Sequence, residues 1–438
     1  MATEVSLRDI DTGIPVFYST YSAARSAAGA GDVISIYANL TEQITLLDGV
    51  DVYLDPGTEL NHSGDGTTIT DNNVTCKCNI TGGGIIKNSY SGSTKRECIK
   101  ISNSSSEVNI ECYKIDGLGE NNSTLEGSSV DVSAAAKFRL ICNKVYNKYN
   151  TAIRISGCDD IFLNIRTVES GTAASPNADS PVLSLERTGS VYINELLCTG
   201  YGSCLDHKDG VIGATINKLL TLLPAGETPS TTAPTLLLDA GTGDQDLVLY
   251  FDEIKNFNST GGDTVKIDEG KASLIGRSIY CTNGKSLDLT HPIVSAYIQC
   301  DEIISLTEGI NIANRNEPIV IEANYIEGSS GNGGVIKSVS LSNYVLRNAK
   351  IKNTTTSSPS IGIYIVDGDI NDQNIEIENL IIVTGIAENQ DYSIYRDGEN
   401  NINIKNLLLF VRAGISDNIT LLIGDINNFK YIEDSTIQ

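Results

Sequence analysis

The chain of 438 residues lacks tryptophan and contains only one methionine and three histidines. Its histidines, His62, His207 and His291, lie far apart in the sequence, and the pair Cys76 and Cys78 has no second pair at zinc-binding spacing. We therefore expect no metal site and no cofactor. The absence of tryptophan also removes the side chain best suited to stacking on sugar rings.

Long apolar runs and basic residues are scarce as well. No apolar run approaches the roughly 18 residues of a membrane-spanning helix, and the opening MATEVSLRDIDTG lacks the basic start and apolar core of a secretory signal. We expect no membrane insertion, no signal peptide and synthesis in a cytoplasm. The 31 Lys and Arg against 55 Asp and Glu give a net charge of −24, which opposes binding to nucleic acid and weakens the case for a polyanionic sugar chain.

A short pattern of alternating apolar residues recurs along most of the chain. Its copies are spaced by 23 to 33 residues and are rich in Val, Ile, Leu, Phe and Tyr, which indicates strands because helices would need apolar residues at a spacing of 3.6. A recurrence of this length is typical of a solenoid. The copies begin at Val108, Phe138, Ile161, Val191, Ala214, Leu247, Ala272, Ala296, Ile319, Tyr344, Ile375 and Ile402.

A second, shorter alternating segment lies between consecutive copies, as in CIKIS at Cys98 and AIRIS at Ala152. Strands that recur without helices between them can stack coil on coil, each pairing in parallel with its equivalent one turn later. The sequence therefore predicts an all-β fold, a single-stranded parallel β-helix. Equivalent positions are expected to form columns, such as Cys112 with Cys142, or Asn348 with Asn379 and Asn406.

The two ends of a solenoid expose unpaired backbone and need caps. An Ala-rich segment from Ser19 to Gly29 has Ser and Thr as candidate N-caps and ends at Gly29 and Gly31, which predicts an N-terminal capping helix over residues 19–31. Residues 1–18 are assigned to an attachment arm, and residues 32–438 to the parallel β-helix.

The segments after the capping helix resemble a known group of proteins. The motifs are GDVISI from Gly31, ITLLDGVDV from Ile44 and NITGGGII from Asn79. Together with the Ala-rich helix they are similar to the opening coils of pectate-lyase-like right-handed β-helix proteins, especially bacteriophage tailspikes and tail fibres. The resemblance covers about residues 15 to 90 in motif detail and the rest as repeat architecture. It implies a right-handed β-helix.

The resemblance also implies a function. It points to a virion structural protein, a tailspike or tail fibre that forms a homotrimer, attaches to other virion proteins through its N-terminal arm and binds a host-surface polysaccharide. A polysaccharide-degrading enzyme, either a glycoside hydrolase or a lyase, is one alternative. A secreted bacterial adhesin is another, although it would need a signal peptide.

The middle residues of the short strands point outward and form a column of mixed charge, from Lys100 and Asp131 through Arg154 to Asp206. A solvated face explains this column most simply. For a hydrolase, which needs one protonated and one ionised carboxyl, Asp206 as general acid and Asp209 as base are the first candidates. For a lyase, Arg154 with Asp159 and Asp160 is the candidate set.

The long strands have an outward face that combines aromatic rings with amides. Aromatic rings can stack on sugar rings while amides bind their hydroxyls, so this face is the candidate for ligand binding, with ordinary sheet surface or a subunit contact as the alternatives. In this alignment Phe162 neighbours Tyr192, and Asn164 neighbours Asn194. The candidate binding residues are Phe162, Asn164, Tyr192, Asn194, Asn217 and Tyr297.

Overall fold

A computed structural model describes most of the chain, and its described residues form two compact units. Those up to Asn217 belong to unit 1 and those from Lys218 onward to unit 2, so that the boundary lies within strand β19. The described ranges are 5–90, 97–118, 127–148, 150–171, 180–186, 189–199, 202–222, 233–238, 245–258, 261–290, 294–313, 318–330, 334–339, 343–355, 360–366, 374–384, 391–396, 401–412 and 426–434.

Strands make up nearly all the regular structure of unit 1, where they belong to two sheets. The first sheet contains β1 (Val5–Arg8), β2 (Pro15–Tyr18), β3 (Val33–Ile36), β5 (Asp51–Leu54), β6 (Glu59–His62), β8 (Lys77–Gly82), β9 (Ile85–Asn88), β11 (Glu107–Gly117), β13 (Ala135–Asn147), β15 (Cys158–Ser170), β17 (Gly189–Cys198) and β19 (Gly210–Thr221). The second contains the short strands β4 (Ile44–Thr45), β7 (Ile69–Thr70), β10 (Ile99–Ile101), β12 (Val130–Val132), β14 (Ile153–Ile155), β16 (Leu183–Leu185) and β18 (Leu205–His207).

Unit 2 has the same two kinds of strand. Its long strands, some of them broken in two, are β21 (Gln245–Asn256), β23 (Gly270–Cys281), β25 (Val294–Ser305), β27 (Ile319–Gly328), β29 (Asn343–Arg347), β30 (Lys350–Asn353), β32 (Asn374–Thr384), β34 (Asn401–Arg412) and β35 (Ile426–Asp434). Its other sheet contains β20 (Leu236–Leu238), β22 (Val265–Ile267), β24 (Leu287–Leu289), β26 (Ile310–Ile312), β28 (Ile336–Val339), β31 (Ser360–Val366) and β33 (Asp391–Arg396).

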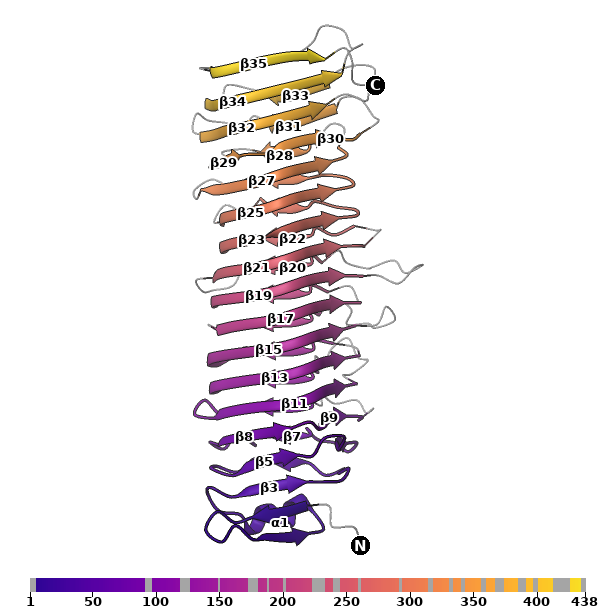
Figure 1. Ribbon diagram of the computed structural model, residues 1–438, viewed down its shortest axis with the longest axis vertical. Helices are drawn as coiled ribbons and strands as arrows, with labels where there is room; N and C mark the ends of the chain where they lie inside the picture. Colours follow the sequence, from indigo (N-terminus) through magenta and orange to yellow (C-terminus); the bar gives the residue numbers. More distant parts are fainter. Residues whose placement is uncertain are drawn as a thin grey trace. The chain divides into compact units, whose positions relative to one another are not determined.

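Each strand of a coil pairs in parallel with the equivalent strand of the next coil. In unit 1 the long strand β11 pairs with β13, and β13 with β15, while the short strand β10 pairs with β12, and β12 with β14. Unit 2 repeats this arrangement from β21 to β23 and from β22 to β24. Within each unit, the successive long strands lie side by side in Figure 1. The protein is therefore an all-β, right-handed parallel β-helix, as predicted.

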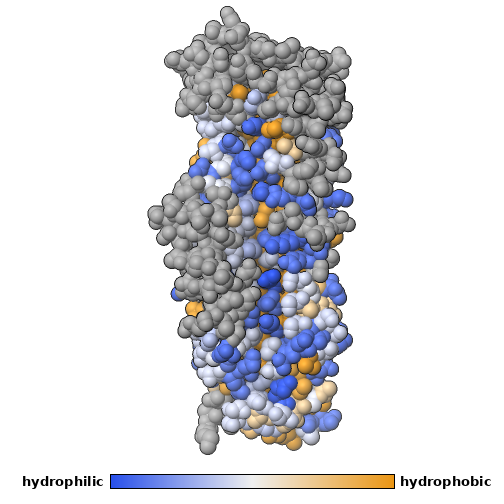
Figure 2. All heavy atoms as spheres, turned by 180° about the vertical axis from the view of Figure 1, so that it is seen from behind, coloured by the Kyte–Doolittle hydropathy of each residue, from blue (hydrophilic) through white to orange (hydrophobic). Residues whose placement is uncertain are grey.

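The interior of each unit is filled by the alternate residues of these strands. In β13, Phe138, Leu140 and Val145 are fully buried, whereas Lys137 and Arg139, on either side of Phe138, are exposed. This alternation is the period of two expected for strands with one buried face. The view from behind shows that hydrophilic side chains predominate over the described part of that surface, with scattered hydrophobic ones (Figure 2).

The long strands bend at a position where the pairing skips one residue. The register of β11 and β13 passes from Cys112 with Cys142 directly to Lys114 with Lys144. In unit 2 this bend holds Asn348 and Asn379, which have φ angles of 58° and 56°, a left-handed conformation that Asn tolerates better than most residues. The Asn379 amide donates to the Asn348 carbonyl oxygen at 3.0 Å, which confirms the predicted column over these two residues. The side chain of Asn406 lies outside the described residues. The cysteine column is confirmed too, with Sγ atoms 3.6 Å apart.

The N-terminal cap contains the expected helix and, in addition, a hairpin. Helix α1 (Tyr21–Ala27) begins after Thr20, whose hydroxyl accepts a hydrogen bond from the Ala23 amide at 3.1 Å. Strands β1 and β2 form an antiparallel pair, and the other edge of β1 pairs with β3 of the first coil. Residues 5–18, the described part of the predicted attachment arm, therefore fold onto the first coil of the solenoid. A hairpin was missed because its strands have only four residues each.

Buried asparagines close the turns that follow several long strands. Asn88, Asn147, Asn256 and Asn353 each end such a strand and are at most 2 % exposed. In all four, the side-chain amide donates to a backbone carbonyl, which belongs to the following turn for Asn88, Asn256 and Asn353 and to Gly127, 20 residues earlier, for Asn147. The side-chain oxygen of each accepts from a backbone amide two or three residues ahead. These side chains satisfy backbone groups that would otherwise be buried without partners.

The substitution Asn353→Ala is expected to destabilise unit 2 by roughly 2 to 3 kcal/mol, because it removes the donor to the carbonyls of Ser330 and Ile361 (both 2.8 Å) and the acceptor for the Thr355 amide. Urea denaturation followed by circular dichroism measures the change. The matched control is Asn324→Ala, which removes an exposed amide that donates to Asp301 at 3.0 Å; its midpoint should stay close to that of the wild type. Equal midpoints for both variants would contradict the role assigned to the buried asparagines.

Candidate functional site

A hollow of about 410 Å³ lies on the outer face of the long strands of unit 1. Strands β13, β15, β17 and β19 supply its lining, and four of the candidate binding residues, Asn164, Tyr192, Asn194 and Asn217, are part of it. The structure thus brings these four side chains together around one depression. We call it the second hollow, because a first hollow, described below, is lined by residues that come mostly earlier in the chain. The lining of the second hollow is completed by Ile141, Cys142, Asn143, Ile165, Arg166, Ile193 and Thr215.

An aromatic pair borders the second hollow. The ring centroids of Phe162 and Tyr192 are 5.8 Å apart and the rings are tilted by 47°, within the range that favours aromatic contact. The Arg139 guanidinium lies over the Phe162 ring, 4.5 Å from its centroid. Tyr192 is 47 % exposed, so that part of its ring is available to a ligand.

Amide side chains continue the hollow along the bend of the long strands. The Asn217 amide donates to the Asn194 carbonyl oxygen at 3.0 Å, which aligns the two side chains from coil to coil. Asn164 lies beside Tyr192 in the register of β15 and β17. Because each amide carries both donors and an acceptor, these side chains can bind a hydroxyl that donates a hydrogen bond as well as one that accepts one.

The sequence alignment misplaced these neighbours by two residues. It paired Phe162 with Tyr192 and Asn164 with Asn194, whereas the structure pairs Phe162 with Ser190 and Asn164 with Tyr192. The ring contact of Phe162 with Tyr192 is consequently diagonal. A shift of two residues keeps every side chain on its own face of the strand, so hydrophobic alternation does not detect it.

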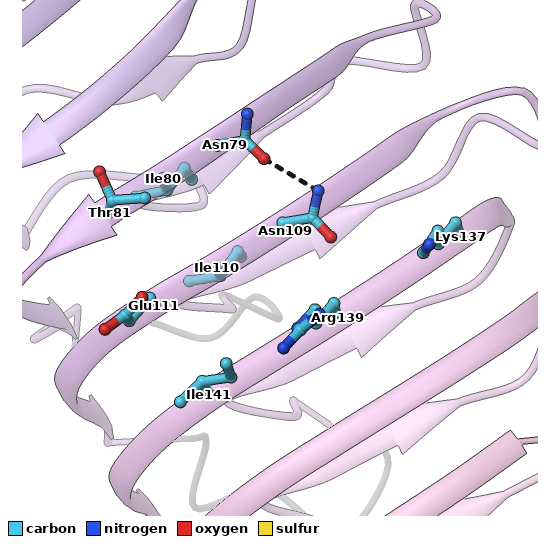
Figure 3. Close-up of a pocket in the computed structure, with 9 residues that line it drawn as sticks. All are labelled: Asn79, Ile80, Thr81, Asn109, Ile110, Glu111, Lys137, Arg139 and Ile141. Carbon is cyan, nitrogen blue, oxygen red and sulfur yellow. Dashed lines mark hydrogen bonds between the residues drawn. The ribbon is translucent and has the colours of Figure 1, made fainter.

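A first hollow of about 360 Å³ adjoins the second and shares Ile141 with it. Its residues come from β8, β11 and β13 (Figure 3). The Asn109 amide donates to Asn79 at 2.9 Å, and the Asn79 amide donates to the Asp51 carboxylate at 3.0 Å, so that a ladder of polar side chains crosses three coils. Lys137, Arg139 and Glu111 also line this hollow.

The sequence analysis overlooked the first hollow, although a signal for it exists. Asn79, Asn109 and Arg139 share one register position on consecutive strands. Each follows an inward apolar residue, as Asn109 follows Val108 and Arg139 follows Phe138. Comparing outward positions across all copies would have revealed this column.

Tyr297, the sixth candidate binding residue, belongs to β25 of unit 2. Its hydroxyl donates to the Glu322 carboxylate at 3.2 Å. The aromatic and amide group described above is therefore confined to unit 1, and Tyr297 is not part of it.

The carboxyl pair proposed for hydrolysis lies at the end of the short-strand sheet of unit 1. Asp206 is in β18, is 5 % exposed and has the Lys208 ammonium 3.4 Å from its carboxylate, while Asp209 is half-buried in the following turn. His207 between them is buried, with both ring nitrogens facing backbone carbonyls.

The column that contains Asp206 has the predicted register, since Lys100, Asp131 and Arg154 pair in turn and Arg154 is followed by Ser184 and Asp206. However, Ser184 and Asp206 are only 4 % and 5 % exposed. The interpretation of this column as a solvated face is therefore wrong at these two positions. The lyase candidates Arg154 and Asp160 lie on strands of different sheets, β14 and β15.

A second carboxyl pair, which the sequence did not suggest, occurs in unit 2. The Lys285 ammonium lies 3.0 Å from Asp288 and 3.9 Å from Asp263, and the Lys285 backbone amide donates to Asp263 at 2.9 Å. Burial raises the pKa of the Asp263 carboxyl to about 6, with a smaller contribution from the Asp288 carboxylate, against the lowering effect of Lys285. Asp288 is 6 % exposed, so its carboxylate is not accessible to a ligand as large as a polysaccharide.

The chain matches no protein-family model, no curated protein and no solved structure. Across the described ranges, no group of three or more His, Cys, Asp or Glu side chains is arranged to hold a metal ion. Within the same ranges, no helix has the length and apolar character needed to span a membrane.

Asp263 should make unit 2 more stable in acid. Because the pKa is raised in the folded state above the ordinary value of 3.8, folding takes up a proton, and this group's contribution to stability increases as the pH falls from about 6 to 3.8 and is lost above that window. As the pH falls through this range, the free energy of unfolding of the wild type should increase by on the order of 1 to 3 kcal/mol relative to that of Asp263→Asn. Denaturation midpoints measured from pH 7 to pH 4 test this, with the exposed Asp301→Asn as control. Parallel pH profiles for the wild type and Asp263→Asn would refute it.

Proposed function

We propose that this protein is a bacteriophage virion protein, a tailspike or tail fibre, that binds host-surface polysaccharide through the two hollows of unit 1. The observation that carries the proposal is the second hollow, which Asn164, Tyr192, Asn194 and Asn217 line together and where the Tyr192 ring contacts that of Phe162. The parallel β-helix and the opening motifs that resemble tailspikes support the same function.

The chemistry of the two hollows suits sugars. A pyranose ring presents C–H groups on its faces and hydroxyls at its edge, so it needs an aromatic plate with hydrogen-bonding groups around it. Tyr192 supplies the aromatic ring, and the donors and acceptors come from Asn164, Asn194 and Asn217. Adjacent coils repeat this surface at about 4.8 Å, which suits a polymer that contacts several coils at once.

The N-terminal hairpin is our candidate for attachment to other virion proteins. Three of its exposed side chains are large and apolar, with Ile14, Val16 and Phe17 at 67 %, 51 % and 55 % exposure. Exposed apolar side chains on an edge strand are a feature of surfaces that pair with other chains. We further propose that the protein assembles as a homotrimer. The depolymerase and adhesin alternatives stay predictions from the sequence.

The substitution Tyr192→Ala is expected to weaken binding to the host polysaccharide at least tenfold, because it removes the exposed aromatic plate. Binding of purified protein to extracted capsular or cell-wall polysaccharide, measured by biolayer interferometry, provides the readout. Tyr250→Ala is the matched control, since Tyr250 is 50 % exposed on a long strand of unit 2. The proposed site is wrong if both variants bind as tightly as the wild type.

Sedimentation equilibrium of the full chain tests the assembly. A homotrimer gives a mass three times the 46.8 kDa of one chain. A mass of 46.8 kDa at micromolar concentration would exclude a stable trimer while leaving the binding site to be judged by the Tyr192 experiment.

A further inference from the structure

We infer that the polysaccharide bound by unit 1 is acidic, and that Arg139 and Arg166 recognise its carboxylate groups. The inference rests on the proposed function and specifies its substrate class. Both arginines are exposed, Arg139 in the lining of the first hollow and Arg166 in that of the second. The shared residue Ile141 joins the two hollows.

Among the described residues, neither guanidinium group is engaged by a carboxylate. Over the described ranges, no carboxylate lies within ion-pair distance of Arg139 or Arg166. Several lysines of unit 1 are paired, as Lys77 is with Glu107 at 2.5 Å and Lys144 with Glu169 at 2.6 Å. In a chain with a net charge of −24, two unpaired arginines in adjoining hollows point to an anionic ligand.

The position of Arg139 prepares it for a carboxylate. Its guanidinium carbon lies 4.5 Å from the centroid of the Phe162 ring. A contact with the ring restricts the guanidinium, and those of its N–H groups that do not face the ring can donate to a ligand. Those donors have the geometry that binds a carboxylate through two parallel hydrogen bonds. Phe162 therefore acts as a support for Arg139 as well as part of the aromatic pair.

The spacing of the arginines fits a polymer with repeated acid groups. Arg139 is opposite Phe162 in the register of β13 and β15, and Arg166 follows four residues later on β15. At about 3.3 Å per residue, their backbone positions are about 13 Å apart along the strand. They are thus placed to bind two separate carboxylates. Glu111 also lines the first hollow, and its carboxylate would repel an acid group of the ligand that came close to it.

The net charge of the chain does not prevent this binding. At physiological ionic strength, charges more than about 8 Å apart are largely screened, so distant Asp and Glu side chains have little effect on a ligand in the hollows. Whether an anionic ligand binds therefore depends on its direct contacts, and a bidentate pair between Arg and a carboxylate is among the stronger hydrogen-bonded contacts.

The experiment uses acidic bacterial surface polysaccharides, each beside its carboxyl-reduced form, in which uronic acids are converted to the neutral sugars without a change of linkage. The full-length protein should bind acidic members of this panel, and reduction of the carboxyl groups should weaken binding at least tenfold. Arg139→Gln and Arg166→Gln should each cause a similar loss with the acidic form and little further loss with the reduced form. The control is Arg277→Gln, whose guanidinium is paired with Asp252 at 2.6 Å in unit 2.

The outcomes separate this inference from the proposed function. If the protein binds reduced or neutral polysaccharides as tightly as acidic ones, and Tyr192→Ala abolishes that binding, the acidic specificity is overturned and the proposed function stands. If no member of the panel shows binding that depends on Tyr192, both fail. Circular dichroism of each variant verifies that the β-helix is intact, and the exposure of both arginines makes these substitutions compatible with folding.

Discussion

Every coil of this protein depends on the backbone hydrogen bonds that it exchanges with the coils before and after it. A strand such as β12, three residues long, could not be stable alone, yet it pairs with β10 on one side and β14 on the other. Because the pairing is parallel and in register, each position in a coil lies beside its equivalent in the next. The apolar interior, the column of Asn348 and Asn379 at the bend, and both hollows follow from this constraint.

Registered stacking turns single residues into columns, and the hollows of unit 1 are built from such columns. One of them runs from Asn79 through Asn109 and Arg139 to Phe162. Along it the chemistry changes from amide to guanidinium to aromatic ring within four coils. Neighbouring members contact one another, through the hydrogen bond between the two asparagines and the stacking of Arg139 on Phe162. The surface is thereby ordered before any ligand binds, which lowers the entropy cost of binding.

The fold could be predicted from the sequence because its main signal, alternation with a long-range recurrence, is repeated in every coil. Most copies were also aligned correctly, as Val108 with Phe138 and Leu247 with Ala272 show. The exception, at β15 and β17, arose because a shift of two residues leaves the alternation intact. The acidic pair Asp263 and Asp288 was out of reach for another reason: their proximity depends on how turns pack against the short strands, and no periodic pattern records that packing.

The separation of inward and outward residues explains how such a scaffold can hold a specific binding surface without weakening its core. Leu140 and Leu163 are fully buried, while Arg139 and Asn164, each next to one of them in sequence, face the hollows. Substitution of an outward residue leaves the buried stack and the backbone pairing unchanged. The outward surface, including the proposed binding site, can therefore vary one coil at a time, whereas stability is shared by all coils of a unit.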